Sequence, residues 1–263
     1  MFDCHMHTKF STDSVMEADA ACETAIGIGL DGIAFTDHLD FDYPDESFNI
    51  DFDEYFSHIT AVRERYRNKL KVMTAVEVGI QPHVLAESLD VVESHPFDYV
   101  LASIHIIDRL DPYKGDYYTN KTKLEAYERY LQEILFMIRN FRSFDMVGHF
   151  EYVIRCAGYP DRTLRYAEHS DTFDAIMREL IVSGRGFELN TGTYRNAASD
   201  VEYDIEVLKR YRSLGGELIC LSSDAHRTEH IAMRFEHYAQ MLRDTGFRYT
   251  VHFEGRKPIF NKL

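Results

Sequence analysis

The sequence has few cysteines, few glycines and no long apolar run. Its four cysteines, Cys4, Cys22, Cys156 and Cys220, form no C-x-x-C pair, so we expect reduced thiols. The 14 glycines are too few for collagen or low-complexity sequence. No apolar run approaches the roughly 18 residues of a membrane span. The first residues, MFDCHMHT, lack the basic and apolar regions of a signal peptide, and a cytoplasmic protein is therefore expected.

Basic residues are also scarce relative to acidic ones. The 29 lysines and arginines stand against 44 aspartates and glutamates, which gives a formal net charge of −15. Such an acidic surface repels phosphate polymers, so we expect no binding of duplex nucleic acid. A locally positive site, made by metal ions or a few arginines, could still bind a small anion. Apolar residues make up 45% of the chain, which excludes a wholly disordered protein.

Short apolar runs alternate with amphipathic segments along the whole chain. The runs lack clean alternation of apolar and polar residues, which is typical of strands covered on both faces. The predicted strands are 1–7, 32–38, 71–78, 97–105, 144–150, 186–191 and 217–226. The predicted helices are 16–29, 53–68, 83–94, 121–141, 168–183, 201–214 and 228–245, and 249–263 looks like a closing strand or hairpin. This order predicts one parallel β/α sheet and a single domain spanning 1–263.

The predicted strands share one property, which is that each ends in polar residues. In a parallel β/α barrel these ends meet on one face, where the loops converge. Each histidine taken alone is more often structural or solvated, but scattered histidines would not fall at the same end of successive strands. The pattern therefore favours a metal site. The end residues are His5, His7, Asp37, His38, Glu77, His105, His149, Asn190, Asp224 and His226. We assign no function to His58, His83, His95, His169, His237 and His252.

Spacing indicates where the side chains of the first strand point. His5 and His7 are two residues apart, so both imidazoles are expected to face one side of the strand. Cys4 and Met6 are then expected to face the other side and to lie in the core.

The next two strand ends carry carboxylates with different expected roles. Asp37 and His38 are adjacent and cannot both point inward from a regular strand, so we expect His38 to be a ligand and Asp37 to orient ligands. Glu77 ends an apolar strand, where an unpaired carboxylate is costly, and a metal ion is the better explanation for it.

The ordered set of motifs resembles the polymerase-and-histidinol-phosphatase (PHP) family over nearly the whole chain. The motifs are His5-Met6-His7-Thr8, Ser11-Thr12-Asp13, Thr36-Asp37-His38, Glu77, Ser103-Ile104-His105, Gly148-His149 and Ser223-Asp224-Ala225-His226. The resemblance implies a distorted (β/α)7 TIM-like barrel in the α/β class. It also implies up to three divalent metal ions, commonly zinc, manganese or iron.

The resemblance further implies which residues hold each ion. One metal would take His5, His7, Glu77 and Asp224. A second would share Glu77 and take His105 and His149, and a third would take Asp13, His38 and His226. Other members carry a histidine where this chain has Asp13, and the harder carboxylate would shift the preference toward manganese or iron. The alternative role for Asp13 is a helix N-cap.

The chain length and motif layout are similar to those of the stand-alone histidinol-phosphate phosphatases. This similarity implies a metal-dependent phosphomonoesterase that hydrolyses L-histidinol phosphate to L-histidinol and phosphate in histidine biosynthesis. Arg155 and Arg195 follow the fifth and sixth strands, where such phosphatases hold the substrate phosphate, and a guanidinium suits that contact. The alternative for each arginine is an ordinary surface salt bridge.

A proton donor for the leaving group is expected on the loop after His38. Asp40 is the predicted general acid, although a solvated acidic loop is an open alternative, and His230 and Asp108 are weaker candidates. The tyrosines of 113–118 could form a lid or could simply pack.

Two rival functions use the same residues. A PHP phosphodiesterase or nuclease acting on nucleotides or other small phosphate esters is disfavoured by the acidic charge and the lack of a basic groove. A non-catalytic metal-binding domain is disfavoured because no ligand position is lost.

Overall fold

The computed structural model describes residues 1–44, 47–195 and 201–263, and its central feature is a parallel sheet curved into a nearly closed barrel. The strands lie in the order β1 (Phe2–Met6), β2 (Gly32–Phe35), β4 (Lys71–Gly79), β5 (Tyr99–Ser103), β6 (Met146–Val147), β7 (Gly186–Asn190) and β8 (Ile219–Ser222). A parallel bridge joins Met6, at the end of β1, to Ala225, which follows β8, and so connects the two edges of the sheet. The predicted α/β barrel is confirmed, and all strand C-termini lie at one end.

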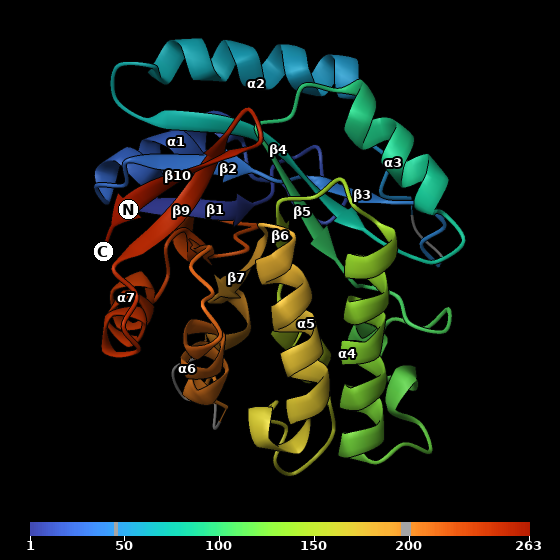
Figure 1. The fold of residues 1–263 in the computed structure, drawn as a ribbon. Coiled ribbons are helices and arrows are strands. Elements are labelled where there is room, and N and C mark those ends of the chain that lie inside the picture. The colour runs from blue at the N-terminus through green and yellow to red at the C-terminus, as the bar shows by residue number, and fades with distance from the viewer. Residues whose placement is uncertain (45–46, 196–200) are drawn as a thin grey trace.

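Helices connect the strands and cover the outside of the barrel (Figure 1). They are α1 (Ala18–Gly27), α2 (Phe52–Tyr66), α3 (Leu85–Ser94), α4 (Lys123–Asn140), α5 (Ser170–Val182), α6 (Ile205–Ser213) and α7 (Phe235–Asp244). The last helix is shorter than predicted, because Thr228–His230 forms a separate 3-10 turn. Within the described residues, no helix is long and apolar enough to cross a bilayer.

The second predicted strand is interrupted after β2. A separate strand, β3 (His38–Asp40), pairs with the second half of β4. In the break, the Asp37 carboxylate accepts hydrogen bonds from the Thr8 backbone N–H at 2.6 Å, the Thr8 hydroxyl at 2.9 Å and the Ser11 hydroxyl at 2.8 Å. Asp37 therefore fixes the loop that follows β1, as expected of a residue that orients metal ligands.

β1 carries an irregularity that changes which side chains face inward. Three steps along β1, from Asp3 to Met6, match two steps along β2, as in a β-bulge. As a result, Cys4 packs among the inward-facing residues of the barrel, while Met6 packs in the outer core against the helices. His5 also faces inward, so Cys4 and His5 lie on the same side of the strand. The prediction that Cys4 faces the opposite side from His5 is therefore wrong.

An antiparallel hairpin closes the N-terminal end of the barrel. It consists of β9 (Tyr249–Glu254) and β10 (Lys257–Lys262), and its position is visible in red near the N-terminus in Figure 1. Val251 and Phe253 pack with the inward-facing apolar residues of the barrel, and the Phe253 ring stacks on Tyr99 at 5.2 Å between centroids. The predicted hairpin is confirmed. The barrel is thus apolar at this end and polar at the other.

The start of β7 gives a test of the barrel packing. A Cβ atom on Gly186 would lie 2.0 Å from the carbonyl oxygen of Leu218, and a backbone atom there cannot move unless β7 and β8 separate. We expect Gly186→Ala to lower the free energy of unfolding by about 1–3 kcal/mol, measured by urea unfolding. Gly27→Ala is the matched control, because a methyl group there meets nothing within 4 Å. Wild-type stability in Gly186→Ala would contradict this close approach.

Candidate metal centre

The polar strand ends converge on a single buried carboxylate at the C-terminal end of the barrel. Glu77, near the end of β4, is completely buried. Its Oε2 lies 3.2 Å from His5 Nε2 and 3.1 Å from His38 Nδ1. Its Oε1 lies 2.9 Å from His149 Nε2 and 3.3 Å from His105 Nε2. Four segments that are distant in sequence therefore meet at this one side chain.

Asp224 supplies a second carboxylate from the segment after β8. Its Oδ1 lies 3.6 Å from His5 Nε2 and 3.4 Å from His7 Nε2, and these two nitrogens are 2.9 Å apart. The backbone of Asp224 has a φ of 52°, in the left-handed region that a non-glycine residue adopts at a cost. The backbone N–H of Asp224 donates to the His5 carbonyl at 2.8 Å, which holds this conformation beside the cluster.

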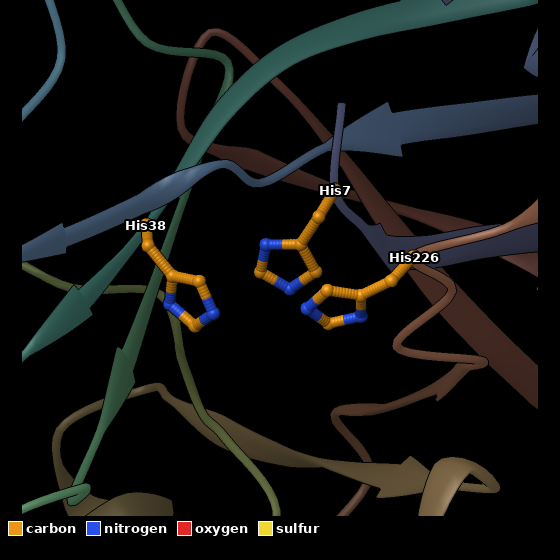
Figure 2. Close-up of side chains that lie close together, drawn as sticks. All are labelled: His7, His38 and His226. Atoms are coloured by element: carbon orange, nitrogen blue, oxygen red, sulfur yellow. The ribbon is translucent and has the colours of Figure 1, made fainter. Parts of the chain in front are cut away.

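Asp13 joins the cluster from the loop after β1. Its Oδ2 lies 3.0 Å from His226 Nε2 and 3.6 Å from His38 Nε2. Helix α1 has Glu17 at its N-cap position, so the alternative of an N-cap at Asp13 is wrong. Figure 2 shows the His7 ring between those of His38 and His226, with centroid distances of 4.2 and 4.1 Å.

These donor atoms fit divalent metal ions. Buried Glu77 Oε2 and His38 Nδ1 face each other without hydrogen-bond geometry, and an unsatisfied pair of this kind is costly unless a cation binds it. Nitrogen and oxygen ligands in this mixture suit zinc, manganese or iron. Among the residues that the structure describes, three groups have all their ligand atoms within 4.8 Å of one another: His5, His7 and Glu77; His38, Glu77 and His105; and His7, His38 and His226. They overlap with the predicted groups, and the assignment of each ligand to one ion stays a prediction.

The two histidines from β1 have opposite electrostatic environments. Burial lowers the pKa of His5, but nearby carboxylates, Glu188 first, raise it well above its usual value. Burial also lowers the pKa of His7, and the neighbouring imidazoles of His226, His38 and His5 lower it further. His7 is therefore in the neutral form that binds a metal, whereas metal binding at His5 would displace a proton.

Glu188 is a residue of this centre that the sequence reasoning missed. It lies in β7 and is buried, and its two carboxylate oxygens are 3.0 and 3.1 Å from His5 Nδ1. It also accepts a hydrogen bond from the His149 backbone N–H at 2.9 Å. Glu188 thus orients two predicted ligands and leaves His5 Nε2 directed at the cluster. The available signal was a carboxylate inside the apolar strand GFELN, which is the same argument that singles out Glu77.

Asp40, the predicted general acid, is buried in β3, so the alternative of a solvated loop is wrong. Its Oδ1 lies 2.7 Å from His105 Nδ1, and its Oδ2 lies 3.5 Å from His38 Nδ1. Burial raises the pKa of Asp40, but His105 and His38 lower it to about 2. A carboxylate in this setting carries no proton near neutral pH, which fits orientation of His105 better than proton donation. Asp108 pairs instead with Arg129, at 2.7 Å.

The cluster opens into a cavity of about 880 Å³ whose wall includes both predicted phosphate-binding arginines. The Arg155 guanidinium lies 2.6 Å from Asp224 Oδ2 and donates through Nε to Thr193 Oγ1 at 3.0 Å. Arg195 donates to the backbone carbonyls of Ser223, at 2.7 Å, and Asp224. Both guanidinium groups therefore lie beside the cluster. The alternative role, an ordinary surface salt bridge for each arginine, does not describe this position.

Comparison with known proteins places this geometry in a family. The family model for the PHP domain matches residues 3–192. The chain belongs to the PHP-domain family. A histidinol-phosphatase from Lactococcus lactis is 31% identical over 261 residues, which cover 99% of this chain and 97% of that one. A Clostridium acetobutylicum protein named "probable histidinol-phosphatase" is 32% identical over 257 residues, which cover 97% and 98%.

A solved structure confirms the PHP barrel along nearly the whole chain. The crystal structure of histidinol phosphate phosphatase from L. lactis, in complex with zinc, L-histidinol and phosphate, matches with a TM-score of 0.93. The two chains are 30% identical, and the match covers 98% of each. The predicted family and fold are therefore confirmed.

The role of Glu188 can be tested by metal affinity. Glu188→Gln keeps the side-chain shape but removes the charge that holds His5 Nδ1, so we expect metal affinity to fall about 10–100-fold in chelator competition. Glu133→Gln is the control, because Glu133 is also buried but pairs with Arg129 on α4. Wild-type affinity in Glu188→Gln would show that Glu188 does not position the ligand.

Proposed function

We propose that this chain is a metal-dependent phosphomonoesterase that hydrolyses L-histidinol phosphate to L-histidinol and phosphate, in histidine biosynthesis. The observation that carries the proposal is the buried cluster of imidazoles and carboxylates at the end of the PHP barrel, with two arginines beside it. The full-length similarity to a histidinol-phosphatase from L. lactis supports the choice of substrate.

The proposed metal ligands are the nine residues predicted from the motifs. Bound divalent ions would supply Lewis-acid polarisation of the phosphate and an activated water as nucleophile. Zinc is supported by the complex of the L. lactis protein, and manganese and iron accept the same donors. The proposed ligands are His5, His7, Asp13, His38, Glu77, His105, His149, Asp224 and His226.

The remaining proposed roles concern the phosphate and the orientation of ligands. Arg155 and Arg195 would hold the phosphate oxygens, because both guanidinium groups line the cavity beside Asp224. Asp40 would hold the His105 ring in place through its 2.7 Å contact with Nδ1. The predicted acid role of Asp40 would require a proton that its two histidine neighbours disfavour.

We also propose that residues 1–263 act as one domain in the cytoplasm. The PHP family model ends at residue 192, yet Arg195, Asp224 and His226 belong to the same cavity wall as residues from the matched part. All four cysteines are free, which fits a reducing compartment. The excess of acidic residues supports a small-molecule substrate in preference to duplex nucleic acid.

A substrate panel separates the proposed reaction from its rival, the hydrolysis of nucleotides or other small esters. Metal-loaded protein is assayed for release of phosphate from L-histidinol phosphate and from a nucleoside monophosphate, and for cleavage of a short oligonucleotide into shorter fragments. We expect kcat/KM to be about tenfold or more higher for L-histidinol phosphate, since a shaped polar site discriminates at least this strongly. A preference for either nucleotide would overturn the proposal, and no turnover of any ester would favour a non-catalytic metal-binding domain.

The phosphate role of Arg195 predicts a loss of turnover without a matching loss of metal. We expect Arg195→Ala to lower kcat/KM for L-histidinol phosphate about 10²–10³-fold while metal content, measured by elemental analysis, changes little. Arg195→Lys keeps the charge but loses the planar guanidinium group with its paired N–H donors, so its activity should fall between those of the wild type and Arg195→Ala. If Arg195→Ala instead loses its metals and keeps its turnover per remaining metal ion, the assigned role is wrong.

A further inference from the structure

One carboxylate in the cavity wall has no part in the metal cluster. Asp111 lies in the loop after β5, at the N-cap of a short 3-10 helix (Pro112–Lys114), and its side chain is buried. The Tyr43 hydroxyl donates to Asp111 Oδ2 at 2.6 Å, and the Tyr152 hydroxyl donates to Oδ1 at 2.9 Å. The Tyr113 backbone N–H also donates to Oδ1, at 2.7 Å. Asp111 is therefore held firmly in one position.

Among the described residues, no lysine, arginine or histidine forms an ion pair with Asp111. Its three hydrogen-bond donors are neutral. Lys114 also lines the cavity, with its amino group 3.4 Å from the Pro44 carbonyl and 5.6 Å from the centroid of the Tyr43 ring. Burying a negative charge without a positive partner is unfavourable, so Asp111 is suited to a cation that arrives in the cavity.

The position of Asp111 relative to the metal cluster suits a small substrate. The Tyr152 ring lies 5.1 Å from that of His149 and 5.2 Å from that of His105, and the Arg155 guanidinium lies 5.3 Å from its centroid. The hydroxyl at the far end of the same ring contacts Asp111. One tyrosine thus spans from the proposed phosphate site to Asp111, a length comparable to the few bonds between a phosphate ester and a neighbouring amine.

We propose that Asp111 binds the ammonium group of the substrate alcohol, and so selects aminoalkyl phosphates over phosphomonoesters that carry no cation. L-Histidinol phosphate has an amine on the carbon adjacent to its ester carbon. This inference rests on the proposed function, because that substrate supplies the amine. An alkyl ammonium is charged at neutral pH, whereas an imidazole with a pKa of about 6.5 is largely neutral there. The amine is therefore the better partner for a carboxylate.

Aromatic rings in the cavity wall add to this cation site. Tyr43, Phe48 and Tyr113 also line the cavity, and aromatic faces attract cations. Arg155 and Arg195, at the phosphate side, match the opposite charge of the same substrate. The cavity therefore carries charges of both signs, which suits a molecule with a phosphate and an ammonium group and disfavours a simple anion.

The test compares three substrates in one variant. Asp111→Asn keeps the side-chain size but removes the charge, and kcat/KM is measured with L-histidinol phosphate, phosphoethanolamine and p-nitrophenyl phosphate. We expect a loss of about 10–100-fold, mainly through KM, for the two substrates that carry an ammonium group. We expect kcat/KM for p-nitrophenyl phosphate to stay close to the wild-type value.

Asp116→Asn is the matched control, because Asp116 is exposed and lies five residues further along the same loop. It should leave all three values unchanged. Comparing substrates within one preparation cancels any loss of folded or metal-loaded enzyme. An equal effect of Asp111→Asn on all three substrates, or no effect, would overturn the Asp111 assignment. A loss for L-histidinol phosphate without a loss for phosphoethanolamine would also overturn it, because the amine would then not be the group that is bound.

The proposed function is judged separately, on the wild-type protein. A wild type that does not prefer L-histidinol phosphate in the substrate panel contradicts that function. The cation site would still be supported if Asp111→Asn selectively impaired phosphoethanolamine hydrolysis, and it would be overturned if it did not.

Discussion

The centre depends on the burial of one negative charge, that of Glu77, inside the barrel. Burial raises the pKa of this carboxylate, but the surrounding histidines, His5 first, lower it well below its usual value. The Ser103 hydroxyl adds a hydrogen bond of 2.6 Å to Oε1. A charge in this position is tolerated only with positive partners on all sides, which protonated imidazoles or metal ions provide. The histidines at the other strand ends can therefore be understood as the groups that supply positive charge, or hold metal ions, around the Glu77 carboxylate.

Much of this arrangement could be predicted from the sequence, because a parallel barrel turns order along the chain into proximity. The ends of the strands carry His105 and His149, which are 44 residues apart in sequence, and their Nε2 atoms lie 3.3 Å apart in the structure. Polar residues that end apolar runs are visible without a structure, and the barrel brings them to one face. The strand boundaries were less predictable, since β6 is only Met146–Val147 and His149 lies beyond it.

Other features depend on contacts that a sequence pattern does not contain. The irregularity in β1 turns Cys4 inward because of the pairing register with β2, and no residue in the segment marks it. The role of Glu188 depends on the distance of its carboxylate to His5 Nδ1, although its burial in an apolar strand was a usable signal. Asp111 lies in a polar loop, where its burial follows only from the tyrosines that pack around it.

The hairpin of β9 and β10 affects how the substrate enters the barrel and the products leave it, as well as the stability of the barrel. Its apolar side chains fill the interior behind the cluster, so in the described part of the chain the cavity with Arg155 and Arg195 lies on the opposite, open side. An incoming ester and the departing products would then share this open side of the barrel. A product that stayed in the cavity would occupy the space that the next ester needs. Competition between product and ester therefore follows from the topology of the barrel, whichever side chains perform the reaction.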